Sequence, residues 1–293
     1  MNHTEATGLA FIVISGILWG TIGVVSRWLS ADGLTPLTIS AFRFLISAAI
    51  LVLWAVSVYG LRGLVALPRR DATLMLLNGA MLAISQTSYL SAIPLAGVTI
   101  STLIVICSAP LAVAAFSRLV RRERLNGKVV FALLASILGT TMLVGVPSES
   151  GSPDLAGGTF YSLVSALSYA AVIQIGHGLT RRHNPLRINA ISFLIGALLL
   201  WVIAIPSGVS LPARPEAWLL IAYLGVFPSV TAYALFLRGM RVTSATISSI
   251  LVLLEPLVAA LLAALIFGER LSPLGLVGGM LMCAGFIALV RRN

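Results

Sequence analysis

The sequence predicts an all-α integral membrane protein in which ten transmembrane helices form two inverted five-helix repeats around a central cavity. Three observations point to this fold. Hydrophobic residues make up 59% of the 293 residues and charged residues 10%, with a mean hydropathy of +1.05. Basic residues gather in alternate connecting segments, and short motifs recur about half a chain apart. A chain this apolar has lipid as its main solvent.

The ten helices are predicted from hydrophobic windows of about 20 residues, the length that crosses the hydrocarbon core. Charged or Pro- and Gly-rich segments separate windows at 9–29, 36–58, 72–92, 95–117, 127–146, 156–178, 187–206, 217–237, 243–267 and 273–290. The first window has no charged leader and is followed by further spans, so we interpret it as the first helix rather than a signal peptide. The connecting segments are too short for a soluble domain, so the function is expected to lie in the helices and their ends.

The basic residues predict the orientation. If the N-terminus lies inside, the inner segments hold 15 of the 19 basic residues: Arg62, Arg69, Arg70, Arg118, Arg121, Arg122, Arg124, Lys128, Arg181, Arg182, Arg187, Arg238, Arg241, Arg291 and Arg292. The outer segments hold Arg27, Arg214 and Arg270. The positive-inside rule therefore predicts a bacterial-type inner-membrane protein with both termini in the cytoplasm. We interpret the net charge of +10 as this topology signal and not as a sign of nucleic-acid binding.

Cofactor and enzyme signals are weak in this sequence. Cys107 and Cys283 fall inside predicted spans and show neither a disulfide framework nor metal-ligand spacing. The spans contain no Ser/His/Asp set, paired carboxylates or phosphate-binding loop. We therefore expect no cofactor and no metal, and an enzyme is the less favoured alternative. The oligomeric state stays open.

An internal repeat divides the chain into halves at 1–146 and 147–293. Three motifs recur at offsets of 146 to 147 residues: 99–102 as 246–249, 109–111 as 255–257, and Glu-Arg-Leu at 123–125 as 269–271. Trp19 matches Tyr169 at an offset of 150, and Tyr89 matches Tyr233 at 144. Because each half has an odd number of helices, the second half must be inverted, and this symmetry is typical of alternating-access carriers. The alternative is that duplication only made a larger bundle.

The motifs resemble those of a known superfamily. The segment Gly16–Gly20, the stretch Pro36–Phe44, the helices with Pro110 and Pro256, and the paired Glu-Arg-Leu ends look like the drug/metabolite transporter superfamily, in its EamA-type branch. Within that branch the chain is similar to bacterial amino-acid or metabolite exporters, including the YddG type. The resemblance implies a central cavity between the first four helices of each half, with the fifth and tenth helices peripheral, and export as the direction of transport.

Glu255 is the strongest candidate for a functional residue. It lies in the ninth predicted span beside Pro256, where an ionised carboxylate costs roughly 2.5 to 3.5 kcal/mol on insertion scales. The functional interpretation is that this costly carboxylate lines a polar pathway through the membrane. The structural alternative is a protonated side chain bonded to a carbonyl that the proline leaves free. Pro110 and Pro256 are expected to loosen helices four and nine and so to act in gating.

Other polar and aromatic residues in the spans are candidates for the same site. The predicted substrate-binding set is Trp19, Asn78, Gln86, Tyr89, Ser101, Ser108, Tyr169, Thr231, Tyr233, Ser248 and Glu255. Ring packing between helices is an equal alternative for Trp19 and Tyr169, and a bond to the preceding turn is the alternative for Ser101, Ser108 and Ser248. Arg43 lies about 10 Å inside the second span, where it either snorkels to the headgroups or serves the site.

These observations predict a carrier that exports small metabolites, neutral or aromatic amino acids first among them, by alternating access. Its partners would be a small-molecule substrate and the lipid bilayer. A proton-coupled exporter of amphipathic cations or drugs is the alternative within the transporter class. A membrane-embedded enzyme is the alternative from another class.

Overall fold

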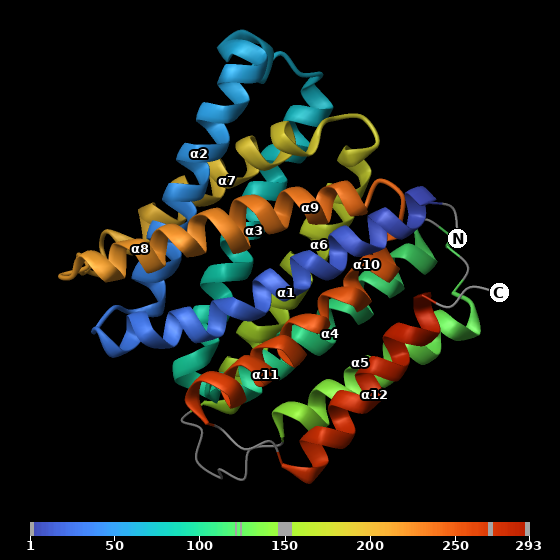
Figure 1. The fold of residues 1–293 in the computed structure, drawn as a ribbon. Helices are drawn as coiled ribbons and strands as arrows, with labels where there is room; N and C mark the ends of the chain where they lie inside the picture. Colours follow the sequence, from blue (N-terminus) through green and yellow to red (C-terminus); the bar gives the residue numbers. More distant parts are fainter. Residues whose placement is uncertain (1–2, 121, 124, 146–153, 269–271, 291–293) are drawn as a thin grey trace.

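The computed structural model describes residues 3–120, 122–123, 125–145, 154–268 and 272–290. Within these ranges the regular secondary structure is helical throughout (Figure 1). The helices are α1 (His3–Ala31), α2 (Pro36–Val65), α3 (Arg69–Ala96), α4 (Val98–Leu119), α5 (Gly127–Val144), α6 (Leu155–Thr180), α7 (Pro185–Ala204), α8 (Pro215–Leu224), the π-helix η1 (Gly225–Thr231), α9 (Ala232–Gly239), α10 (Ala245–Val252), α11 (Leu254–Phe267) and α12 (Pro273–Val290).

These elements correspond to the ten predicted spans. The elements α8, η1 and α9 form one rod, Pro215–Gly239, and α10 and α11 form another, Ala245–Phe267. Among the described residues, eight helices are long and apolar enough to cross a membrane, and Pro273–Leu289 is a shorter apolar helix. The remaining rod, α3, has 28 residues but is less apolar than the others, because it carries Asn78 and Gln86 among its apolar residues. The predicted all-α membrane fold is confirmed.

Local sequence sets several helix boundaries. Side chains of Thr35, Asn126, Asp154, Asn184 and Ser244 accept hydrogen bonds from the first turns of α2, α5, α6, α7 and α10, which satisfies amides that have no partner within the helix. Gly97 alone joins α3 to α4, and its φ of 82° is in the region that favours glycine. The predicted span 36–58 ends just before Gly60, where the backbone of α2 kinks.

The packing of the rods pairs the two halves of the chain. Helix α3 of the first half packs on α6 of the second half, and the α8–α9 rod of the second half packs on α1 of the first. Helix α4 packs on α6, and correspondingly the α10–α11 rod packs on α1; α2 pairs with α7, α4 with α10, and α5 with α12. Figure 1 shows α1 between α9 and α11, with α5 and α12 side by side at the edge of the bundle.

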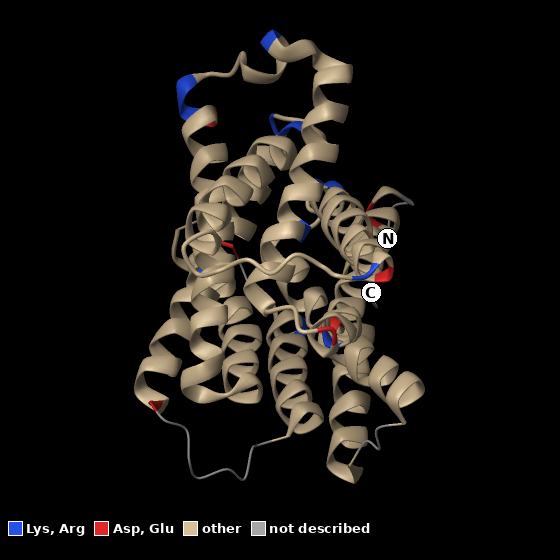
Figure 2. Cartoon of the chain, turned by 90° about the vertical axis from the view of Figure 1, so that its left-hand side faces the viewer, with Lys and Arg blue, Asp and Glu red and all other residues tan. Residues whose placement is uncertain are grey.

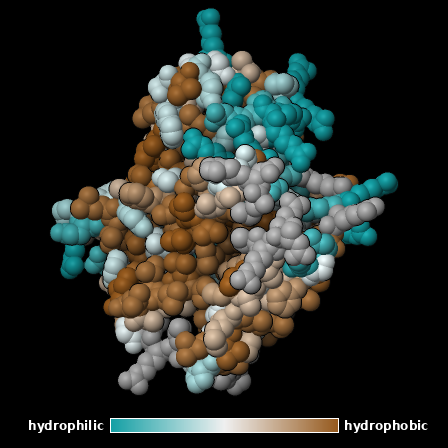
Figure 3. Space-filling view, turned by 45° about the vertical axis from the view of Figure 1, so that its right-hand side comes forward, coloured by the Kyte–Doolittle hydropathy of each residue, from teal (hydrophilic) through white to brown (hydrophobic). Residues whose placement is uncertain are grey.

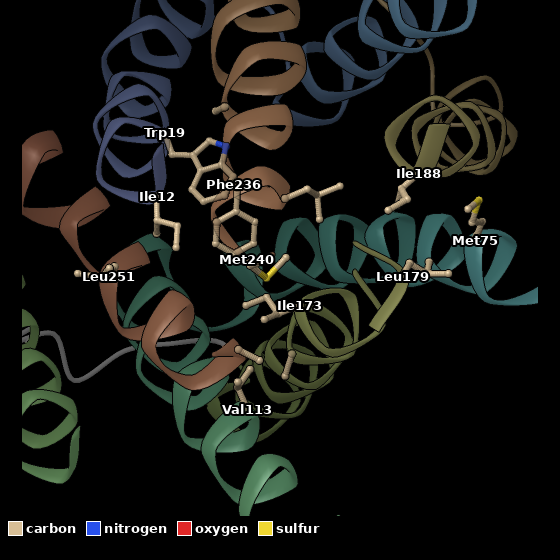
Figure 4. Close-up of a cluster of buried hydrophobic side chains, with 14 residues drawn as sticks. Ile12, Trp19, Met75, Val113, Ile173, Leu179, Ile188, Phe236, Met240 and Leu251 are labelled. Atoms are coloured by element: carbon tan, nitrogen blue, oxygen red, sulfur yellow. The ribbon is translucent and has the colours of Figure 1, made fainter. Parts of the chain in front are cut away.

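The main core lies where the two halves meet. Buried side chains from α1, α3, α4, α6, α7, α9 and α10 form one cluster (Figure 4). It includes Ile12, Trp19, Ile173, Phe236 and Leu251. Because both halves contribute to this cluster, it forms only where the halves pack together.

The surface has the apolar belt of a membrane protein. Brown apolar side chains cover much of the face in Figure 3, with hydrophilic residues gathered toward the edges of the view. In Figure 2, Lys and Arg are found mainly at helix ends, and prominently where α2 leads into α3. Large apolar side chains such as Leu53, Leu219 and Leu265 are more than 70% exposed, which fits contact with lipid.

The predicted orientation can be tested by labelling single cysteines in a variant without Cys107 and Cys283, both of which are free. Cysteines in the 148–154 loop or at Ser207 should react from the periplasm, and cysteines in the 121–126 loop or at Arg181 only after the membrane is opened, because the basic loops stay inside. Residues 146–153, 121 and 124 lie outside the described residues, whereas Ser207 and Arg181 are exposed. The reverse pattern would contradict the predicted orientation.

Candidate functional site

Four polar residues from four other rods lie near Glu255. Arg43 of α2, Tyr89 of α3, Tyr169 of α6 and Tyr233 of α9 each lie within electrostatic range of Glu255 on α11. We call these five residues the central polar cluster. Three of the five rods belong to the second half of the chain and two to the first, so the cluster exists only when the halves pack together.

The cluster is linked by further polar contacts. The hydroxyl of Tyr89 and that of Thr102 are hydrogen-bonded at 2.7 Å, which joins α3 to α4. The phenol groups of Tyr169 and Tyr233 lie close enough to interact. Nearby on α3, the amide nitrogen of Gln86 donates to the hydroxyl of Ser40 on α2 at 3.2 Å. Tyr89 is thus bonded to a hydroxyl on α4, and Gln86, three residues away on α3, to a hydroxyl on α2.

Exposure divides the predicted site residues into two sets. Every member of the central polar cluster is partly exposed although it lies within a helix. The other predicted residues that are partly exposed are Gln86, Ser108 and Thr231. The predicted residues that are buried are Trp19, Asn78, Ser101 and Ser248. The first set is the better candidate for contact with a substrate in this conformation.

Trp19 lies in the core. Its side chain is 3% exposed, and its ring meets those of Tyr233 and Phe236 edge to face at 5.1 and 5.2 Å between centroids. The indole nitrogen donates to the carbonyl of Pro228 at 2.8 Å, and Figure 4 shows the ring beside Phe236. Trp19 therefore positions Tyr233 in this conformation, and the packing alternative describes it better than a substrate wall.

Three other predicted residues have structural partners or deep burial. The Asn78 amide donates to Ser192 of α7 at 3.0 Å, so it joins two helices. Ser248 donates to the carbonyl of Ser244, four residues earlier, at 2.9 Å, which is the ordinary bond of a helical serine. Ser101 is fully buried, and its hydroxyl has no hydrogen-bond partner.

The two gating prolines differ. The helix beside Pro256 is interrupted: α10 ends at Val252 and α11 begins at Leu254. By contrast, α4 runs from Val98 to Leu119 without interruption through Pro110. The fourth helix is therefore continuous through its proline, whereas the ninth is interrupted beside its own. One missing amide donor does not unwind a turn that is buried against neighbours, and Ala109, Pro110 and Val113 are all buried.

The π-helix η1 was not predicted, although Pro228 in the eighth span is a signal that could have revealed it. Segments of π-helix are frequent at functional sites. Side chains donate to four carbonyls in η1 or directly beside it: Ser229 to Leu224 at 2.9 Å, Ser47 to Gly225 at 3.0 Å, Trp19 to Pro228 at 2.8 Å and Ser15 to Ala232 at 2.9 Å. The distorted segment leads directly into Tyr233, so these bonds fix one wall of the cluster.

A second polar group ties α3 to the α6–α7 loop. The buried carboxylate of Asp71 accepts from His183 at 2.7 Å and lies 3.1 Å from Arg182. At the other end of the bundle, Asp32 and the exposed Arg214 form a looser pair at 3.4 Å. That pair borders a cavity of about 210 Å³ that contains none of the predicted site residues. Both pairs hold helix ends and lie apart from Glu255.

The hydrogen bond from His183, followed by the Arg182 charge, lowers the pKa of Asp71 below its ordinary value. Because the folded pKa is depressed, the stabilisation is complete above the unfolded pKa, near 3.9, and is lost as the pH falls through the folded value. Asp71→Asn should therefore have a lower melting temperature than the wild type at pH 7. In acid, where the wild-type carboxyl is protonated, the two melting temperatures should become equal. Asp32→Asn is the matched control and should have little effect, because exposed pairs contribute about 0 to 1 kcal/mol. Equal effects of both variants would contradict this account.

The described residues contain no group of three or more His, Cys, Asp or Glu side chains that could hold a metal ion. The fold and the central polar cluster thus define a polytopic helical membrane protein with an ionisable site between its halves. The profile of the EamA-like transporter family matches the chain twice, over residues 6–145 and 156–291. The protein belongs to this family and is a membrane transporter.

Curated relatives agree with this assignment. The chain is 29% identical to the uncharacterized transporter YwfM of Bacillus subtilis (strain 168) over 95% of this chain and 92% of the relative. It is 30% identical to an uncharacterized transporter of Archaeoglobus fulgidus over 97% and 96%. It is 24% identical to the uncharacterized inner membrane transporter YicL of Salmonella typhimurium over 96% and 94%. A solved crystal structure has the same fold, with a TM-score of 0.84 at 20% identity over 97% of this chain and 96% of that one.

Proposed function

We propose that this transporter exports small metabolites, most specifically neutral or aromatic amino acids, by alternating access, with the central polar cluster as its substrate site. The observation that carries the proposal is the position of Glu255 between the two halves, together with Arg43 and three tyrosines. Ionisable groups within membrane spans usually mark a substrate or ion pathway. The apolar residues around the cluster would accept the substrate side chain.

Alternating access is supported by contacts that recur at the repeat offset. Ser15 and Ser165 are 150 residues apart, as are Trp19 and Tyr169. Ser15 donates to Ala232 at 2.9 Å, and Ser165 donates to Ser85 at 2.8 Å, so each joins the first helix of one half to the third helix of the other. Two halves with the same contacts in opposite orientations can exchange conformations and open the site to either side.

Two glycines at the same offset support this interpretation. Gly8 on α1 packs tightly against Val242, and Gly158 on α6 packs tightly against Ala96. Each glycine lies near the start of its helix and lets a segment of the other half approach closely. We infer that the units are 1–146 and 147–293, inserted in opposite orientations in a bacterial inner membrane with both termini in the cytoplasm.

The test is flux through the purified protein in sealed lipid vesicles. Labelled leucine, phenylalanine and other neutral amino acids should move faster than in empty vesicles, with glutamate, lysine and amphipathic cations as comparison substrates. Flux of amphipathic cations alone, driven by a pH gradient, would favour the proton-coupled drug exporter. Absence of flux for every neutral amino acid would reject the proposed substrate class.

The helix break before Pro256 predicts a kinetic effect. Pro256→Ala restores an amide donor and should straighten the α10–α11 rod, so transport should slow several-fold while equilibrium substrate binding changes less. Pro110→Ala is the matched control and should have the smaller effect, because α4 is already continuous. Transport rates and binding constants measured on the same preparations decide the point. An unchanged rate for Pro256→Ala would assign this proline a packing role.

A further inference from the structure

Arg43 carries a guanidinium nitrogen that the protein leaves unsatisfied. Its Nε atom is buried and has no hydrogen-bond partner. The guanidinium carbon lies 5.3 Å from the centroid of the adjacent Phe44 ring. A buried donor without a partner costs about 1 to 3 kcal/mol, and more for a charged group. A side chain that snorkelled to the headgroups would keep its donors in water, so the buried Nε argues for a role inside the bundle.

The backbone that carries Arg43 is held in place. The hydroxyl of Ser47 donates to the Arg43 carbonyl at 2.6 Å and to the Gly225 carbonyl at 3.0 Å. These two bonds join α2 to η1. Gly225 lies close to this segment, because a Cβ there would meet Ile46 at 2.8 Å. Arg43 is therefore attached to the same distorted segment that leads into Tyr233.

Glu255 is the carboxylate that interacts electrostatically with Arg43. The two groups are within electrostatic range. The described residues nevertheless show no ion pair between them within 4.0 Å. If Arg43 served only to neutralise Glu255, we would expect the two side chains to be in direct contact. Two charges that are held apart in the membrane cost more than two that are paired. Two opposite charges that are near but not joined can instead receive a molecule with both charges.

We propose that Arg43 binds the carboxylate and Glu255 the ammonium group of a zwitterionic α-amino acid, so that the site selects substrates in which both groups are free. This inference rests on the proposed function. The planar guanidinium matches a carboxylate with two parallel hydrogen bonds, which an ammonium group of lysine does not reproduce. A zwitterion adds no net charge to the pair of Arg43 and Glu255, whereas a substrate with one charge leaves the loaded site charged within the membrane, which is costly.

The experiment compares each amino acid with analogues that lack one charge. The probes are labelled L-phenylalanine and L-leucine, their amides, which keep only the ammonium group, and 3-phenylpropionate and 4-methylvalerate, which keep only the carboxylate. Flux and inhibition are measured with purified full-length protein in sealed vesicles. The wild type should prefer each free amino acid over its amide by about tenfold or more, the size expected for a hydrogen bond to a charged group. The two carboxylates should compete with transport.

Arg43→Gln should reduce this preference to about twofold or less by raising KM for the amino acids while leaving the amides unchanged, and Arg43→Lys should restore part of it. Arg27→Gln is the matched control, because Arg27 is an exposed arginine whose guanidinium stacks on Phe267 at 4.2 Å near the end of its helix; it should keep the wild-type preference. If neither Arg43 variant folds, competition by the carboxylates in the wild type decides the question, and its absence overturns the proposal.

The outcomes separate this inference from the function on which it rests. If the wild type moves neither amino acid, the proposed function fails for these substrates and the zwitterion site fails with it. If the wild type moves them but Arg43→Gln keeps the full preference for the free acid, the transporter assignment stands and Arg43 is not the carboxylate ligand. Equal transport of amino acids and amides by the wild type also overturns the proposal.

Discussion

Replacing Glu255 by glutamine is expected to lower amino-acid transport by about tenfold or more. Glutamine keeps the size of the side chain but loses the negative charge, and a hydrogen bond to a charged group contributes about 1.5 to 3 kcal/mol. If Glu255 binds the substrate ammonium, the loss should appear at every pH. If it carries a coupling proton, Glu255→Gln should keep exchange but lose acceleration by a pH gradient. Flux in vesicles with and without such a gradient separates the two roles.

The matched control for this substitution is Glu216→Gln. Glu216 is an exposed carboxylate in the first turn of α8, so its replacement removes the same charge from a helix end. Transport by this variant should stay within about twofold of the wild type, because exposed charges contribute little. Should Glu255→Gln fold normally, transport at the wild-type rate and keep the wild-type pH response, Glu255 would be a structural partner of the interrupted helix and the proposed site would fail.

The second large effect is expected at the contact between α5 and α12. A Cβ on Gly139 would lie 2.5 Å from the carbonyl oxygen of Gly278 and 2.5 Å from Cγ of Met282. The carbonyl belongs to the backbone and cannot turn away, so Gly139→Ala must push the two helices apart. Overpacking of this kind costs about 1 to 3 kcal/mol. The melting temperature and the yield of monodisperse protein should both fall.

Gly23→Ala is the matched control for Gly139→Ala. Gly23 lies within α1, and a Cβ there meets nothing within 4 Å. This substitution should be neutral or stabilise the protein by up to about 1 kcal/mol, because alanine favours a helix more than glycine does. The same chemical change should thus have opposite signs at the two positions. If both variants melt at the same temperature, the close approach of α5 and α12 has no energetic consequence.

Hydropathy predicted the helices because the cost of placing a residue in lipid depends mainly on that residue and its neighbours in sequence. The rod boundaries follow from local signals too, such as Thr35 before Pro36 and the glycines after α3 and α5. Local sequence did not predict the structure at Pro228, because a proline within a span permits a kink, a break or a π-helix. The π-helix is stabilised here by side-chain donors from α1 and α2, which are distant in sequence.

The sequence by itself therefore determined that this protein is a ten-helix membrane protein with a duplicated half and a costly carboxylate at residue 255, since each of these follows from composition, repetition or the local cost of burial. Only the tertiary structure decided which polar side chains meet that carboxylate. In a membrane bundle the lipid is as apolar as the core, so hydrophobic periodicity does not say which face of a helix points inward. For this reason Trp19 is found in the core and Arg43 beside Glu255, two placements that only the packing of the halves reveals.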